Sequence, residues 1–199
     1  VNGSFVLTST SFWSSTVDAG DVTTGGVGEN LLTKATARSI YTYLGSNVNL
    51  SDTSNAFSTG NAGITKELLE VADDTEKNKL ISFVHGIDAY DENSNGNTTE
   101  KREWIMGDVL HAKPLVVNYA GYTFSAANEA DCNVNKSIVF VGANDGMLHA
   151  FRDCDGSELW AYLPAELLPD LNQMRSGNHT YFVDASPFVY TYDADKDGL

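Results

Sequence analysis

Residues 138–160 constrain the fold more than any other part of this 199-residue chain. Two short apolar runs are separated there by Gly-Ala-Asn-Asp-Gly at residues 142–146, and Asn, Asp and Gly tolerate the positive φ angles that a tight hairpin requires. A second turn, Asp155-Gly156, precedes a third short run that ends at Trp160. The pattern predicts three antiparallel strands joined by two tight turns.

The character of the chain changes near residue 104. Loops and helical spacing dominate before it, whereas short apolar runs of strand length dominate after it. We therefore expect a loop- and helix-containing lead-in over residues 1–103 and a mainly β part over residues 104–199. Within the lead-in, residues 29–43 fit either a short amphipathic helix or a helix that passes into a strand. The other predicted helices cover 65–71, 75–85, with Asp73 or Asp74 as its cap, and 164–174. The other predicted strands cover 4–8, 104–106, 114–119, 180–184 and 187–192.

The chain carries 12 Lys and Arg residues against 27 Asp and Glu residues, a formal net charge of -15. This charge repels phosphate backbones and anionic headgroups, so we expect no nucleic acid partner. No run of about eighteen apolar residues is present, so we expect no membrane span. The chain begins with Val1 and shows no export signal, so we expect a processed or excised piece. Acidic chains of this composition are often extracellular and bind divalent cations, but a solvated surface explains the charge equally well.

The two cysteines, Cys132 and Cys154, lie just outside the strands of the predicted hairpin. Pairing those strands about their turn brings the two residues opposite one another, within the reach of a disulfide. Such a bond would place the chain in an oxidising compartment. Two free buried thiols in a reducing compartment are the alternative.

Residues 193–198 form the most specific ionic motif. Asp193, Asp195 and Asp197 alternate and are followed by Gly198, which matches the first half of an EF-hand-like calcium loop. Three carboxylates at this spacing repel one another unless a cation lies among them. The alternatives are a calcium site and an acidic turn without metal, and the carboxylate that would complete the coordination lies beyond Leu199.

A second and weaker calcium candidate precedes residue 104. Asp91, Asn93 and Asn95 repeat the same rhythm, with Gly96 in the sixth position and Glu100 downstream. Asparagines replace two carboxylates, so we expect a lower affinity than at the first loop. Asn- and Gly-rich turns are also common without metal.

The remaining polar residues suggest no catalytic chemistry. His85, His111, His149 and His179 follow no spacing typical of a zinc site, and we expect each to be structural. The serines lack a Gly-x-Ser-x-Gly motif, and no nucleophile, base and orienting acid can be assigned. The sequence thus predicts no catalytic and no cofactor-binding residues, and calcium is the only cofactor expected.

Four sequence blocks together resemble a known family. They are Gly-Asp-Val-Leu-His-Ala-Lys-Pro at 107–114, Val-Gly-Ala-Asn-Asp-Gly-Met-Leu-His-Ala-Phe at 141–151, Glu-Leu-Trp-Ala-Tyr-Leu-Pro at 158–164 and His-Thr-Tyr-Phe-Val-Asp-Ala-Ser-Pro at 179–187. In order and spacing they are similar to the C-terminal domain of the PilC/PilY family, the type IV pilus tip-associated proteins. The hairpin, Asp-Gly turn and Trp160 also resemble the repeat of quinoprotein-type β-propellers.

The resemblance implies part of a quinoprotein-like β-propeller at the bacterial cell surface, on the pilus tip or outer membrane. It further implies roles in pilus biogenesis, adhesion and calcium-dependent control of retraction, with the family's calcium loop carried onto Asp193, Asp195 and Asp197. Pilin or minor pilin subunits are the expected partners, and a host or surface receptor is a further one.

About two blades' worth of strands are present, whereas propellers typically have about four to eight blades. We therefore expect a downstream segment or a second chain to complete the propeller. Two other functions fit the same blade motif: a fragment of a quinone-dependent dehydrogenase, and a generic propeller scaffold completed by a second chain.

Overall fold

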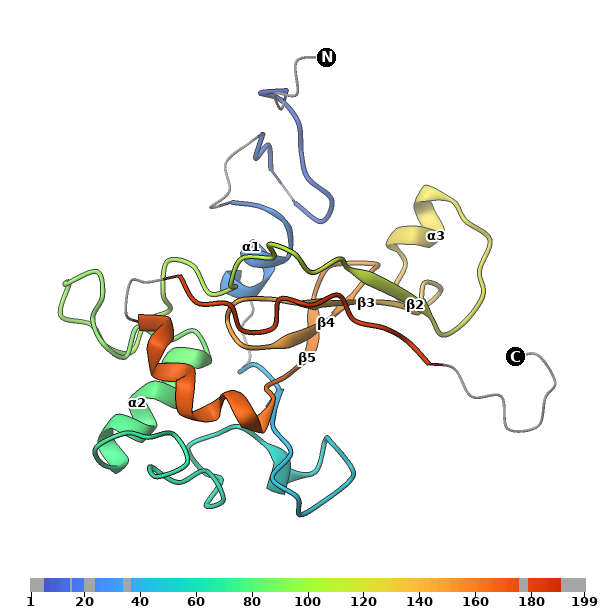
Figure 1. Ribbon diagram of the computed structural model, residues 1–199. Coiled ribbons are helices and arrows are strands. Elements are labelled where there is room, and N and C mark those ends of the chain that lie inside the picture. Colours follow the sequence, from blue (N-terminus) through green and yellow to red (C-terminus); the bar gives the residue numbers. More distant parts are fainter. Residues whose placement is uncertain (1–5, 15, 20–23, 34–36, 176–178, 191–199) are drawn as a thin grey trace.

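Five strands form a single open sheet at the centre of the computed structural model, which describes residues 6–14, 16–19, 24–33, 37–175 and 179–190 (Figure 1). Their order in the sheet is β1-β5-β4-β3-β2. The strands are β1 (Ile40–Tyr41), β2 (Leu115–Asn118), β3 (Ser137–Gly142), β4 (Leu148–Arg152) and β5 (Glu158–Tyr162).

The predicted meander is confirmed by the antiparallel pairing of β2, β3, β4 and β5. Gly146 lies at φ +87° in the β3–β4 turn, which is the left-handed conformation that the Asn-Asp-Gly sequence predicts. The fifth strand comes from the lead-in, because β1 pairs in parallel with β5 through Ile40 and Ala161. A helix that passes into a strand is therefore the correct alternative for residues 29–43.

Helices flank the sheet and make the described fold mixed rather than mainly β. The helical elements are α1 (Gly26–Thr33), η1 (Thr53–Asn55), α2 (Asp74–Val84), α3 (Ala126–Ala130) and η2 (Ala165–Arg175), of which η1 and η2 are 3₁₀-helices. The predicted cap of α2 is confirmed, since the Asp73 side chain accepts from the backbone N–H groups of Thr75 and Glu76. The helix expected after Pro164 forms as η2, and Pro169 inside it cannot donate an α-helical hydrogen bond.

Four predicted strands do not form among the described residues: 6–8, 104–106, 180–184 and 187–190 lack ladder pairing, and residues 4–5 and 191–192 lie outside the described residues. The helix expected at 65–71 forms only turns. Side-chain contacts hold the 180–184 segment in place of a ladder. Asp184 accepts from the backbone N–H of His111, and the Asn144 side chain accepts from that of Phe182. Side-chain hydrogen bonds to segments that are distant in the sequence thus stand here in place of strand pairing.

Two apolar clusters cover the same face of the sheet. The register places Val141, His149 and Ala161 side by side on that face, with Ile40 beyond them. One cluster joins β1, β5, α2 and η2, and the other joins α1, β3 and β4. The buried members of the first are Ile40, Phe57, Ile64, Leu69, Leu80, Ile81, Val84, Met147, Ala161, Leu163, Leu168 and Leu171; those of the second are Leu31, Ile105, Ala112, Val139, Val141 and Phe151. The lead-in and the later strands thus share their core, while the boundary at residue 103 stays a prediction.

The predicted disulfide between Cys132 and Cys154 is confirmed, with 5.2 Å between the Cα atoms. It closes a loop with a sequence separation of 22, for which the chain-entropy model gives about 3 kcal/mol of stabilisation. Trp13 packs against the neighbouring turn and donates its indole N–H to the carbonyl of Asp153. In the described part of the chain, none of the helices combines the length and apolar composition needed to cross a bilayer.

Candidate functional site

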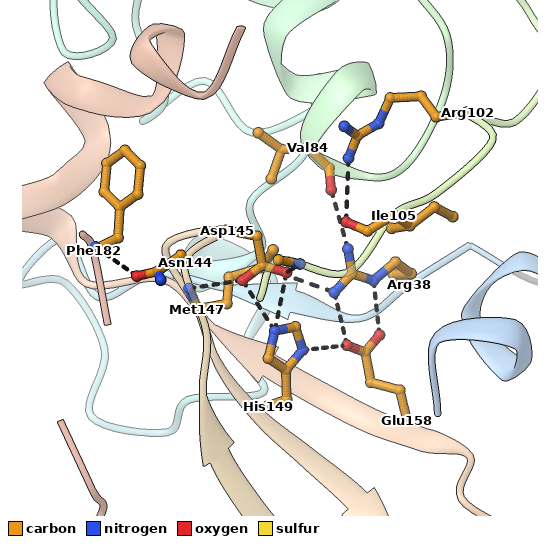
Figure 2. Close-up of polar contacts among 11 residues, drawn as sticks. Arg38, Val84, Arg102, Ile105, Asn144, Asp145, Met147, His149, Glu158 and Phe182 are labelled. Carbon is orange, nitrogen blue, oxygen red and sulfur yellow. Dashed lines mark hydrogen bonds and ion pairs between the residues drawn. The ribbon is translucent and has the colours of Figure 1, made fainter. Parts of the chain in front are cut away.

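Four ionisable side chains are buried together on the covered face of the sheet: Arg38, Asp145, His149 and Glu158 (Figure 2). Each is less than 9 % exposed, and His149 is completely buried. We call this group the buried charge network. It brings the lead-in, the β3–β4 turn, β4 and β5 to one point.

Arg38 and Glu158 form the strongest pair of the network. The guanidinium Nε lies 2.8 Å from Oε2 of Glu158 and Nη2 lies 2.7 Å from Oε1, a two-pronged geometry. The remaining nitrogen, Nη1, donates to the carbonyl of Val84 at the end of α2, at 3.1 Å. One side chain therefore joins the segment before β1 to both β5 and α2.

His149 links the two carboxylates. Its Nδ1 lies 2.9 Å from Glu158 and its Nε2 lies 3.1 Å from both oxygens of Asp145, so both ring nitrogens donate. Asp145 also accepts from the backbone N–H groups of Gly107 at 3.1 Å and Met147 at 3.3 Å. Because a Cβ on Gly107 would lie 2.2 Å from the backbone nitrogen of Asp145, only glycine allows this approach.

A β-bulge turns Glu158 into the network. The pairing of β4 with β5 shifts between Ala150 and Phe151, so that Phe151 faces Glu158 while Ala150 faces Trp160. Regular alternation would place Glu158 on the same face as Trp160, away from His149. The extra residue, Leu159, is 37 % exposed. The bulge thus directs a carboxylate into the core and an apolar side chain to the surface.

The charges of the network balance. Burial alone would lower the pKa of His149, but Asp145 and the hydrogen bond to Glu158 outweigh it and raise that pKa to about 9. Burial alone would raise the pKa of Glu158, but Arg38 and His149 lower it to about 2. Asp145 likewise has a lowered pKa, because His149 and Arg38 outweigh its burial. At neutral pH, two cations therefore face two anions.

This arrangement is suited to holding the fold rather than to chemistry on a substrate. His149 is enclosed and commits both ring nitrogens to carboxylates, in agreement with the structural role expected for it. Sequence reasoning did not single out Arg38, Asp145 and Glu158. The available signal was a set of charged residues within or beside short apolar strands.

The first predicted calcium loop, Asp193, Asp195 and Asp197, lies outside the described residues. The second lies within them, and the structure brings its members together around Glu100. The side-chain amides of Asn93 and Asn95 both donate to Oε1 of Glu100, the former at 2.9 Å. Asp91 closes the loop by accepting from the backbone N–H of Gly96 at 2.9 Å.

These contacts create a concentrated anionic point on an exposed loop. Hydrogen bonds from Asn93, Asn95 and Asn97 lower the pKa of Glu100, which keeps its carboxylate ionised. The loop offers carboxylate and amide oxygens, the ligand types that Ca²⁺ prefers, although the amides here present their N–H groups to Glu100.

The other group of potential metal ligands is already used covalently. Among the described residues, the one set of at least three His, Cys, Asp or Glu side chains with ligand atoms close enough for a shared metal is Cys132, Cys154 and Asp155. The two sulfur atoms of this set form the disulfide.

Comparison with known proteins relates the chain to type IV pilus biogenesis factors. It is 33% identical over 141 residues to the type IV pilus biogenesis factor PilY1 of Pseudomonas aeruginosa strain UCBPP-PA14, an alignment that spans 63% of this chain and 12% of PilY1. It is 34% identical over 132 residues to PilY1 of strain PAK, covering 58% of this chain and 11% of that protein. A PilY1 homologue of Xylella fastidiosa is 35% identical over 120 residues, covering 52% of this chain and 10% of the homologue.

The chain is thus a distant homologue of PilY1 type IV pilus biogenesis factors, and the expected family resemblance is confirmed. It spans only about a tenth of the length of these relatives. No family model and no solved structure matches the chain.

The buried charge network predicts a large effect of removing one charge. Glu158→Gln leaves the Arg38 guanidinium buried without a carboxylate partner. Removing one partner of a buried ion pair lowers the free energy of unfolding by about 3–5 kcal/mol. Urea unfolding measures this loss, with Glu67→Gln on the surface as the matched control. A loss below about 1 kcal/mol, the level of an exposed pair, would contradict the role given to the network.

The raised pKa of His149 predicts that the folded chain loses stability at alkaline pH. Its pKa in the folded chain, about 9, exceeds the ordinary value of 6.5 for histidine, so its contribution is fully present below pH 6.5 and disappears as the pH rises through about 9. Unfolding free energies measured between pH 6 and pH 10 should fall across this window. The same series on His149→Gln should be flatter there; an equal slope in both proteins would assign the effect to other groups.

Proposed function

We propose that this chain is a non-enzymatic module at the tip of a type IV pilus, acting in pilus biogenesis, adhesion and calcium-dependent control of retraction. The observation that carries the proposal is the homology to PilY1 type IV pilus biogenesis factors. The disulfide between Cys132 and Cys154 adds support, because such bonds persist in oxidising, extracytoplasmic settings. Pilin or minor pilin subunits would be its assembly partners, and a host or surface receptor its adhesive target.

We further propose that the sheet is one blade of a quinoprotein-like β-propeller. Its second face carries apolar side chains that are only partly buried, and the rings of Phe140 and Trp160 meet there with centroids 5.8 Å apart. Propeller blades bury both faces against neighbouring blades, so a half-buried apolar face supports this arrangement. The neighbour would come from a downstream segment or a second chain. The partly buried apolar and aromatic residues of this face are Tyr41, Leu115, Val117, Ile138, Phe140, Leu148, Trp160 and Tyr162.

Calcium would bind at the loop of Asp193, Asp195 and Asp197, and more weakly at the loop of Asp91, Asn93 and Asn95. The first proposal rests on the carboxylate spacing. The second is supported by the gathering of the Asn side chains around Glu100. Calcium there would require the amides to turn their oxygens inward.

The pilus role is tested in the bacterium that encodes the chain. Deleting this coding region should reduce surface pili, counted by electron microscopy, and abolish twitching motility. The unaltered sequence and Glu67→Gln should restore both, whereas Glu158→Gln should restore them poorly because it destabilises the fold. Normal piliation and normal twitching in the deletion strain would refute the pilus role.

Calcium binding is tested by isothermal titration of the chain extended past Leu199, because the first loop needs a further carboxylate downstream. We expect heat from the unaltered chain, a large loss in Asp195→Ala and a smaller loss in Glu100→Gln, because the first loop carries more charge. Asp74→Ala removes an exposed carboxylate from α2 and serves as the control for non-specific charge effects. Equal heats in all four proteins would show that neither loop is a specific site.

A further inference from the structure

A cavity of about 420 Å³ lies among α1, α2 and the segment that leads into β1. Leu31, Ile81, Ile87 and Ile105 supply apolar wall surface, and three of these residues are buried. Mainly apolar cavities of roughly this size are the usual form of small-ligand sites. The walls therefore suit a compact apolar group.

Polar groups converge on the same cavity. The hydroxyl-bearing residues Ser58, Thr59 and Ser82 line it, and within the described chain none of the three hydroxyls bonds to another protein group. A hydroxyl can donate to an anionic oxygen without any change of protonation. These hydroxyls are therefore available to hydrogen-bond polar groups of a ligand in the cavity.

The charge of the lining is opposite to that of the chain. Arg38 and Lys101 line the cavity and, among the residues that the structure describes, no Asp or Glu does, although the chain has a net charge of -15. Arg38 is bonded to Glu158 and Val84, and the Lys101 ammonium lies 2.6 Å from the carbonyl of Leu32. Because Glu158 balances the charge of Arg38, the field that favours a negative group in the cavity comes mainly from Lys101.

His85 fits the same polarity. Its Nε2 lies 2.6 Å from the carbonyl of Phe57, which can only accept, so this nitrogen carries the proton. Burial outweighs that hydrogen bond and lowers the pKa of His85, with Arg38 adding to the shift. The imidazole is therefore neutral at physiological pH and adds polar wall surface without charge.

We propose that this cavity binds a small amphiphilic monocarboxylate. Its apolar body would lie against Leu31, Ile81 and Ile105, and its carboxylate would accept hydrogen bonds from the hydroxyls of Ser58, Thr59 and Ser82. The site is separate from the calcium loops and from the pilus role proposed above.

The proposal is tested by titrating the full chain with octanoate below its micelle concentration, using isothermal calorimetry. We expect one octanoate per chain. Octylammonium has the same apolar body and the opposite charge. Its affinity should be lower by a factor of about ten or more, as the loss of one charged hydrogen bond implies. Acetate, which has the carboxylate without the body, should give no measurable heat. No octanoate binding, or equal binding of octanoate and octylammonium, would overturn the proposal.

Variants locate the binding in this cavity. Ser82→Phe fills the space and should abolish octanoate binding, whereas Ser51→Phe, at an exposed serine outside the lining, should leave it unchanged. Circular dichroism checks that both fold. If Ser82→Phe is unfolded, Thr59→Phe replaces it on another wall. Unchanged octanoate binding in a folded cavity-filling variant would show that the ligand binds elsewhere and would refute the assignment.

Discussion

The pairing of Arg38 with Glu158 is the interaction on which the rest of the described structure depends. A guanidinium and a carboxylate that are both buried cost several kcal/mol each to remove from water, and only their close two-pronged geometry and further hydrogen bonds offset that cost. Glu158 also orients His149, and through it Asp145 in the hairpin turn. The sheet, its first turn and the end of α2 are therefore fixed by a single connected set of charges.

Local patterns in the sequence were sufficient for much of the fold. The meander follows from its turns, α2 from the Asp73 cap and its apolar face, and the Cys132–Cys154 disulfide from the hairpin register. Each of these depends on residues close together in the chain. The strand expected at 180–184 does not form: the Asp184 side chain accepts from the backbone N–H of His111, and the backbone N–H of Phe182 donates to the Asn144 side chain instead of a neighbouring strand.

The buried charge network could not be predicted in the same way. Arg38 and Glu158 are 120 residues apart, and strand alternation alone would turn Glu158 to the wrong face. Only the bulge at Leu159 corrects its direction, and no feature of the sequence marks that bulge. The sequence places Asp145 in a hairpin turn and does not indicate its burial, which the close approach of Gly107 brings about.

The parallel pairing of β1 with β5 has a consequence for the order in which the chain folds. Ile40 leaves the ribosome, or any export channel, about 120 residues ahead of its partner Ala161. Until β5 is made, Arg38 has no carboxylate partner, and the apolar residues of β1 and α2 have no sheet to pack against. Contacts between distant parts of a chain slow folding, because the intervening loop must close first. The lead-in therefore cannot complete its fold until β5 has emerged, and the two halves of the sheet finish folding together.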